Sequence, residues 1–165
     1  LNLFKDTQKV LAEGNVLIEG KDGIIIESEI VTYDKKKNII EAKQSVKVID
    51  TKTNDKMTSD KLLYMKNKDE ILAEGNVLFI GDNGVIIKTE TVSYDNKNKI
   101  LKSNKRTRMD DKFGNSILVD MFNYSTKNKH LRSKGNIQIT DEEKNNYFFD
   151  DVFIDFQKIE WQDRM

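Results

Sequence analysis

The sequence contains no cysteine, no proline, a single histidine and no excess of charge of either sign. Without cysteine, disulfides and thiolate metal sites are excluded, and one histidine makes a transition-metal centre improbable. Proline removes a backbone hydrogen-bond donor, so its absence suits long uninterrupted strands. There is also no run of 18 apolar residues, so the sequence predicts no membrane-spanning helix.

The charge is balanced, with 28 basic and 28 acidic residues among 165. Binding to nucleic acid or to an anionic membrane needs a basic excess on one face, so we expect no nucleic-acid partner. The length suits one domain over residues 1–165, and hydrophobic residues (37%) are placed periodically enough to form a core. Because the chain begins with Leu1, we expect it to be a fragment of a longer protein.

Motifs for catalysis are missing. The sequence has no nucleophile elbow, phosphate-binding loop or dinucleotide fingerprint, and its Asp-rich turns lack the ligand spacing of a calcium loop. His130 lies in a turn-rich segment, where a surface role is expected. Four acids recur evenly along the chain, which indicates a structural strand-end role: Glu29, Asp60, Glu90 and Asp120. The sequence therefore predicts a non-enzyme with no cofactor and no metal.

An internal repeat dominates the chain. Residues 11–40 return as residues 72–101, with 17 of 30 positions identical at an offset of 61. Tyrosines recur every 30 or 31 residues at Tyr33, Tyr64, Tyr94 and Tyr124. The unit is therefore about 30 residues long and is repeated about five times, as in repeat architectures.

Each unit reads as two β-strands. In the first strand apolar or small residues alternate with polar ones, which places them on opposite faces. Nine turn-forming clusters imply about ten strands, joined by links too short for parallel crossovers. These clusters are residues 22–23, 35–38, 53–55, 66–69, 82–84, 96–99, 110–115, 125–129 and 141–146. We predict an all-β, antiparallel meander that curls to enclose its apolar face. Each repeated acid shares the parity of the following Tyr, so either it faces inward near a rim or a bulge resets the register.

The repeated motif has two parts: an apolar-x-Ala-x-Gly-Asn-Val strand, and a small-acid-x-apolar-x-Tyr-Asp strand after a turn. It is carried by residues 10–16, 28–34, 71–77 and 89–95, with echoes at 59–64, 119–124 and 131–137. The motif resembles the OstA-like family of lipopolysaccharide transport and assembly proteins. Within that family the chain is most similar to the N-terminal periplasmic domain of LptD, although it lacks the cysteines that many LptD proteins carry there.

The resemblance implies an open, groove-like β-jellyroll in the periplasm, associated with the outer membrane. Such a module would bind the lipid A acyl chains of lipopolysaccharide in an apolar groove and deliver the lipid for assembly in the outer membrane. The implied partners are neighbouring jellyrolls of the transport bridge, which dock by edge-strand addition, and an outer-membrane β-barrel in the same longer chain.

The apolar rows permit two interpretations: they can fill a core, or they can leave a slot for an apolar guest. The small residues Ala12, Gly14, Ala42, Ala73 and Gly75 leave room, which favours a guest. The residues that we expect to line the groove are Val16, Ile18, Val31, Val46, Val48, Leu62, Val77, Phe79, Val92, Phe122 and Ile137.

Residues 102–108 break the apolar pattern with a basic segment. A solvated strand or rim is the simpler interpretation, since charge runs usually face solvent. The alternative is contact with the phosphates of a lipid head group through Lys102, Lys105, Arg106 and Arg108. Two other functions remain open at this point: a self-assembling structural β-repeat with a filled core, and a carbohydrate-active β-helix enzyme.

Overall fold

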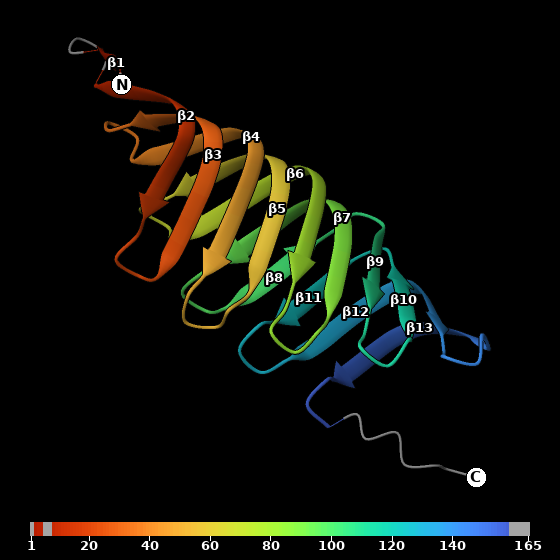
Figure 1. Ribbon diagram of the computed structural model, residues 1–165. Helices are drawn as coiled ribbons and strands as arrows, with labels where there is room; N and C mark the ends of the chain where they lie inside the picture. Colours follow the sequence, from red (N-terminus) through yellow and green to blue (C-terminus); the bar gives the residue numbers. More distant parts are fainter. Residues whose placement is uncertain (1, 5–7, 159–165) are drawn as a thin grey trace.

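The computed structural model describes residues 2–4 and 8–158, with side chains from residue 8 onward. Thirteen strands form one antiparallel sheet, arranged nearly in chain order from one end of the molecule to the other (Figure 1). They are β1 (Asn2–Phe4), β2 (Lys9–Glu19), β3 (Ile24–Asp34), β4 (Ile39–Asp50), β5 (Lys56–Met65), β6 (Glu70–Ile80), β7 (Ile86–Asp95), β8 (Ile100–Ser103), β9 (Thr107–Asp110), β10 (Ser116–Val119), β11 (Phe122–Ser125), β12 (His130–Thr140) and β13 (Asn146–Asp155). The predicted fold class, an all-β antiparallel jellyroll, is confirmed.

The strand count differs from the expected ten for a physical reason. β8 and β9 occupy one expected strand, and β10 and β11 occupy the next, because the chain is interrupted at residues 104–106 and 120–121. β1 is a further short strand, paired with β2 through three residues. All nine predicted turn clusters coincide with chain reversals.

The sheet is folded over on itself along one line, which we call the bend. The pairings among the long strands shift register at this level, for example between Glu13 and Val16 of β2 and between Glu74 and Val77 of β6. β7 pairs with β9 on one side of the bend and with β8 on the other. The two halves of the sheet therefore form two layers, one in front of the other in Figure 1.

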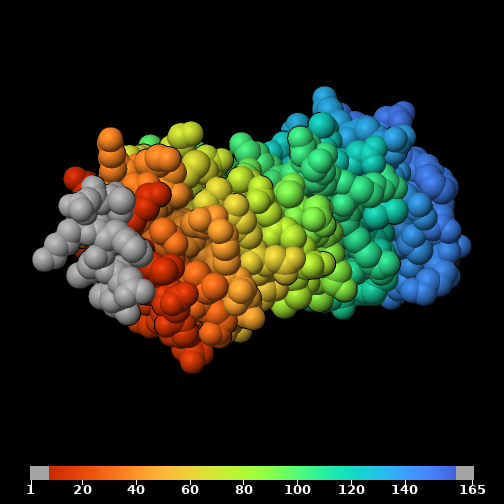
Figure 2. Space-filling view, turned by 90° about the horizontal axis from the view of Figure 1, so that it is seen from above, coloured from red at the N-terminus to blue at the C-terminus, as the bar shows by residue number. Residues whose placement is uncertain are grey.

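Each layer ends in its own set of turns. Layer A holds the reversals near residues 20–23, 51–55, 81–85, 111–115 and 141–145, and layer B holds those at 35–38, 66–69, 96–99 and 126–129. Both sets lie far from the bend along the strands, and we call the edge where they meet the mouth. Viewed from above, the folded sheet is an elongated body along which the chain advances from its N-terminal to its C-terminal end (Figure 2).

Repeated Gly-Asn pairs build the bend. Gly75 and Asn76 both have positive φ (77° and 48°), and the Asn76 side chain donates a hydrogen bond to the Asp60 carboxylate over 2.8 Å. A Cβ at Gly75 would overlap that carboxylate, so only glycine fits. Asn136 repeats the contact with Asp120 over 2.9 Å. A bulge therefore resets the register, so the repeated acids do not face inward near a rim.

The bulges also free backbone carbonyls that must find partners. Buried hydroxyls supply them: Ser28 donates to the carbonyl of Lys43, and Ser133 donates to that of Met121, each over 2.7 Å. These serines occupy the inner side of the bend. The small residue and the acid therefore keep a fixed spacing along the repeat because both make hydrogen bonds that hold the bend.

The core lies between the two layers and draws on both of them. Inward residues of layer A, such as Ile26 and Phe79, join inward residues of layer B, such as Leu62 and Ile71, in one cluster. Each is at most 4% exposed, and full burial of such a side chain stabilises the fold by about 1.5–3 kcal/mol. Across the described part of the chain, no helix is long and apolar enough to span a membrane.

Candidate apolar interior and its mouth

The structure places all eleven residues that were expected to line the groove between the two layers. Nine of them are buried: Val31, Val46, Val48, Leu62, Val77, Phe79, Val92, Phe122 and Ile137. Val16 and Ile18, near the N-terminal end, are half-buried and pack against the same cluster. The interior is therefore continuous along the molecule and more accessible at its N-terminal end.

The interior is filled in this structure. The space left between the layers near Ile24, Val48 and Phe79 is about 20 Å³, room for about one water molecule and far too little for an acyl chain. The expectation that Gly14 and Gly75 leave room for a guest is wrong, because both belong to the bulges at the bend. An acyl chain can enter only if the layers separate.

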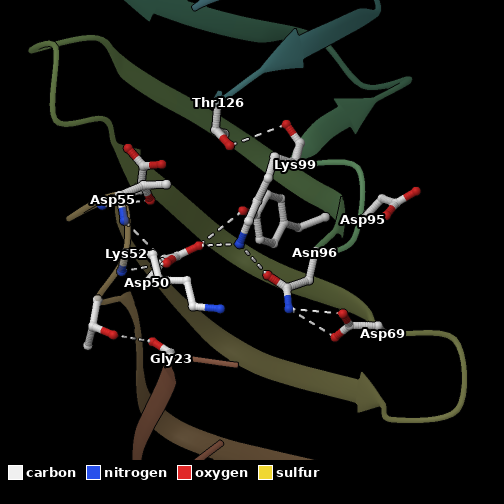
Figure 3. Close-up of polar contacts among 12 residues, drawn as sticks. Gly23, Asp50, Lys52, Asp55, Asp69, Asp95, Asn96, Lys99 and Thr126 are labelled. Atoms are coloured by element: carbon white, nitrogen blue, oxygen red, sulfur yellow. Dashed lines mark hydrogen bonds and ion pairs between the residues drawn. The ribbon is translucent and has the colours of Figure 1, made fainter. Parts of the chain in front are cut away.

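Polar side chains close the middle of the mouth. The Lys99 ammonium of layer B donates hydrogen bonds to the Asp50 carboxylate of layer A over 2.6 Å and to Asn96 over 2.7 Å (Figure 3). The Tyr94 hydroxyl also donates to Asp50 over 3.4 Å. Burial raises the pKa of Asp50, but the Lys99 ammonium and the backbone amides of residues 52 and 53 outweigh it and hold this pKa below its ordinary value.

A second closure lies towards the C-terminal end. The buried Lys129 ammonium of layer B forms an ion pair with Asp82 and lies 3.7 Å from Asp55, both of layer A. Burial raises the pKa of Asp55 despite this neighbour. We call the five residues Asp50, Asp55, Asp82, Lys99 and Lys129 the clasp. They join the two layers by side chains alone.

The mouth differs at its N-terminal end. Here the repeated tyrosines bond within their own layer: the Tyr33 hydroxyl donates to Asn38 and the Tyr64 hydroxyl donates to Asp69, both over 2.9 Å. Among residues 8–158, no hydrogen bond or ion pair joins the layers across this part of the mouth. The clasp therefore covers only the central and C-terminal parts.

The clasp was missed by sequence reasoning, which placed Asp55, Asp82, Lys99 and Lys129 in turn clusters and did not single out Asp50. A signal was present in the repeat: the residue five positions after each Tyr is Asn38, Asp69, Lys99 and then Lys129. A short polar side chain at this position accepts a bond from the Tyr of its own unit, whereas a lysine is long enough to reach the other layer. The exchange of Asn or Asp for Lys marks where the clasp begins.

The structure separates the four basic residues that were considered for head-group contact. Arg106, in the link between β8 and β9, is paired with Asp120, and Arg108 is paired with Asp110 on the outer side of layer A. Lys105 is exposed in the same link, and Lys102 lies on the outer side of layer B. They do not form one patch, because the chain crosses the bend between them.

Within the described ranges, no three His, Asp or Glu side chains are placed to hold a metal ion. His130 begins β12; its Nε2 lies 3.4 Å from Asp155, and its ring packs edge-on against Phe153 at 5.1 Å between centroids. These contacts give His130 a structural role at the surface.

A two-layered, folded antiparallel sheet with an apolar interior is a β-jellyroll. Among solved structures, the chain is similar to LptH from Pseudomonas aeruginosa, which is described as the LptA homologous periplasmic component of the conserved lipopolysaccharide transport device. The TM-score is 0.62 at 13% identity, and the match covers 79% of this chain and 98% of that chain. No protein-family model and no curated protein matches the sequence. The likeness establishes a shared fold.

Proposed function

We propose that this protein is a periplasmic lipopolysaccharide-binding module that carries or receives the lipid's acyl chains between its two layers for assembly in the outer membrane. The observation that supports this function most directly is the continuous apolar interior, built on a fold shared with a transport component. The chain would act by binding and transfer, without catalysis.

The two edges of the folded sheet indicate how lipid would enter. At the bend the layers are joined by the backbone, whereas at the mouth they are joined only by side chains. Burying about ten CH₂ groups of an acyl chain contributes about 8 kcal/mol, which can offset the opening of several polar contacts. Lipid would therefore enter at the mouth, beginning at the N-terminal end where the clasp is missing.

The free sheet edges suit docking to neighbouring modules. At one edge of the sheet, β1 pairs with only three residues of β2. At the other edge, β13 pairs with β12 alone among the described strands. Unpaired strand edges accept additional strands. We propose two partners. One is a neighbouring jellyroll, and the other is an outer-membrane β-barrel of the same longer chain, an arrangement most similar to that of LptD.

Site-specific photo-crosslinking to lipopolysaccharide in cells tests this function. A photoreactive residue at Ile18 or Phe79 faces the interior, and its neighbour at Leu17 or Ile80 faces outward on the same strand as a matched control. We expect adducts from the inward positions only. Equal labelling of both faces, or none from the inward positions in folded protein, would contradict the proposal.

One observation favours a second function, a self-assembling structural module, because the interior is filled in this structure. Such a module would form fibres or long oligomers at high concentration and would take up no lipid. Analytical ultracentrifugation with and without lipopolysaccharide separates the two functions: assembly without lipid uptake would favour the structural role.

A further inference from the structure

A hollow of about 460 Å³ lies on the outer side of layer B, where β8 ends and β11 begins. Its polar lining includes Lys102, Asn123, Arg132 and Lys134, and its apolar lining includes Leu72, Val92, Met121 and Phe122. We propose that this hollow, which we call the outer cleft, binds an anionic saccharide: a sugar that carries a phosphate or a carboxylate.

Strand register places the cationic groups around one point. Lys102 lies opposite Asn123, and Asn123 lies opposite Arg132, so the three side chains share one face of adjacent strands. Neighbouring strands are about 4.8 Å apart, which puts the backbones of Lys102 and Arg132 about 10 Å apart with Asn123 between them. An anion held above Asn123 is within reach of both long side chains, and the arginine can bind it through two parallel hydrogen bonds.

The residue eight positions after each repeated Tyr is Glu41, Leu72, Lys102 and then Arg132, so the positive charge at this position is confined to the last two copies. In the first copy, the position equivalent to Lys102 is Glu41, whose carboxylate pairs with Lys43 over 3.1 Å and with Lys61 over 3.2 Å. The acid therefore neutralises the outer surface there. At the outer cleft the acid is replaced by a cation, and in the described structure neither Lys102 nor Arg132 has a carboxylate within 4.0 Å.

The remaining groups suit a sugar better than a bare anion. Hydroxyl and amide side chains of Thr91, Ser93 and Asn104 also line the outer cleft and can bond to sugar hydroxyls. Phe153 extends the row of strands beside Arg132, is 54% exposed, and has the guanidinium 5.3 Å from its ring centroid. An exposed aromatic side chain beside cations and hydroxyls offers a sugar ring an apolar contact next to polar ones.

One carboxylate is present in the outer cleft. Asp151 lies 3.6 Å from Lys134 at its edge and neutralises that lysine in part. Lys102 and Arg132 therefore carry most of the proposed affinity. Their long side chains extend from the outer side of layer B, whereas Val92 and Phe122, which also line the outer cleft, belong to the interior.

Amide chemical-shift titration of the full chain tests the proposal with four probes: glucose 1-phosphate, glucuronate, inorganic phosphate and glucose. We expect the two anionic sugars to shift amides around residues 91–93, 102–104, 121–123 and 132–134, with at least tenfold tighter binding than inorganic phosphate and no shifts with glucose. Equal binding of inorganic phosphate, or shifts spread over all lysine-rich turns, would overturn the saccharide assignment.

Variants give the matched control. Lys102→Glu restores the acid of the first copy and should weaken binding of glucose 1-phosphate at least tenfold, as should Arg132→Gln. Lys36→Glu changes the same charge in an exposed turn of layer B and should leave binding unchanged. Unchanged affinity in folded Lys102→Glu and Arg132→Gln proteins would overturn the proposal.

Deacylated lipopolysaccharide, titrated in parallel, distinguishes a glycolipid head from a free sugar as the source: shifts at the same amides identify the head group, and their absence identifies the free sugar.

Discussion

The bend and the mouth are the two long edges of the same folded sheet, and they are held together in different ways. At the bend, covalent backbone passes from one layer to the other, and Gly75 and the Asn76–Asp60 bond fix its path. At the mouth, the layers meet only through side chains such as Lys99 and Asp50. One edge is thus a permanent hinge, and the other is a closure that can open without unfolding any strand.

The largest effect is expected from breaking the clasp at its buried cation. Lys129→Met leaves Asp55, which is 4% exposed, and Asp82 without their cation. Removal of one partner from a buried ion pair costs about 3 kcal/mol or more, so we expect a loss of about 3 kcal/mol in the free energy of unfolding, measured by urea denaturation. Lys9→Met is the control, because the Lys9 side chain is half exposed and its ammonium lies 3.9 Å from the Asp34 carboxylate, so the loss of this pair should cost little. A loss below about 1 kcal/mol for Lys129→Met would show that the clasp does not hold the layers.

A slightly smaller effect is expected at the bend. Gly75→Ala places a side chain at φ 77° and against the Asp60 carboxylate, and we expect a loss of about 2 kcal/mol in the free energy of unfolding. Gly14→Ala has a similar φ of 79° with open space around it, so it should cost only about 1 kcal/mol. Equal losses in the two variants would show that strain alone, and not the close approach of Asp60, requires glycine.

The clasp should also make the free energy of unfolding depend on pH in the acid range. The pKa of Asp50 is lower in the folded protein than in the unfolded chain, so its contribution is complete above about pH 4 and is lost as pH falls through the folded pKa. Asp55, with a raised pKa, acts in the opposite direction, because the folded state takes up its proton more readily. In Asp50→Asn we expect the acid slope of the free energy of unfolding to fall by up to about 1.4 kcal/mol per pH unit. An unchanged slope below pH 4 would exclude Asp50 as a source of the acid dependence.

The smallest effect should distinguish the two parts of the mouth. Tyr94→Phe removes a bond between layers, whereas Tyr64→Phe removes a bond within one layer. Each should cost about 0.5–1 kcal/mol. In hydrogen exchange, however, only Tyr94→Phe should speed exchange of amides near residues 50–55 and 96–99. Faster exchange there in Tyr64→Phe as well would place the N-terminal part of the mouth in the same closure.

Much of the fold could be predicted because every copy of the repeat shows a similar pattern of strands and turns. The alternation of apolar residues and the nine turn clusters predicted strands, reversals and an enclosed apolar face. The role of the acids could not be decided, since Asp60 has the parity of Tyr64 and only the bulge at the bend places it on the outside. The clasp was also missed, because Lys99 and Asp50 are 49 residues apart and meet only when the sheet folds over.

The sequence by itself determined the all-β class, the unit of about 30 residues and the set of inward-facing side chains, because strand alternation and turn chemistry are local properties. Only the tertiary structure decided that the sheet folds into two layers, that the interior is filled, and that one edge is closed by buried ion pairs. These features depend on which repeats face each other, and repeats of similar sequence carry little local information about their distant partners.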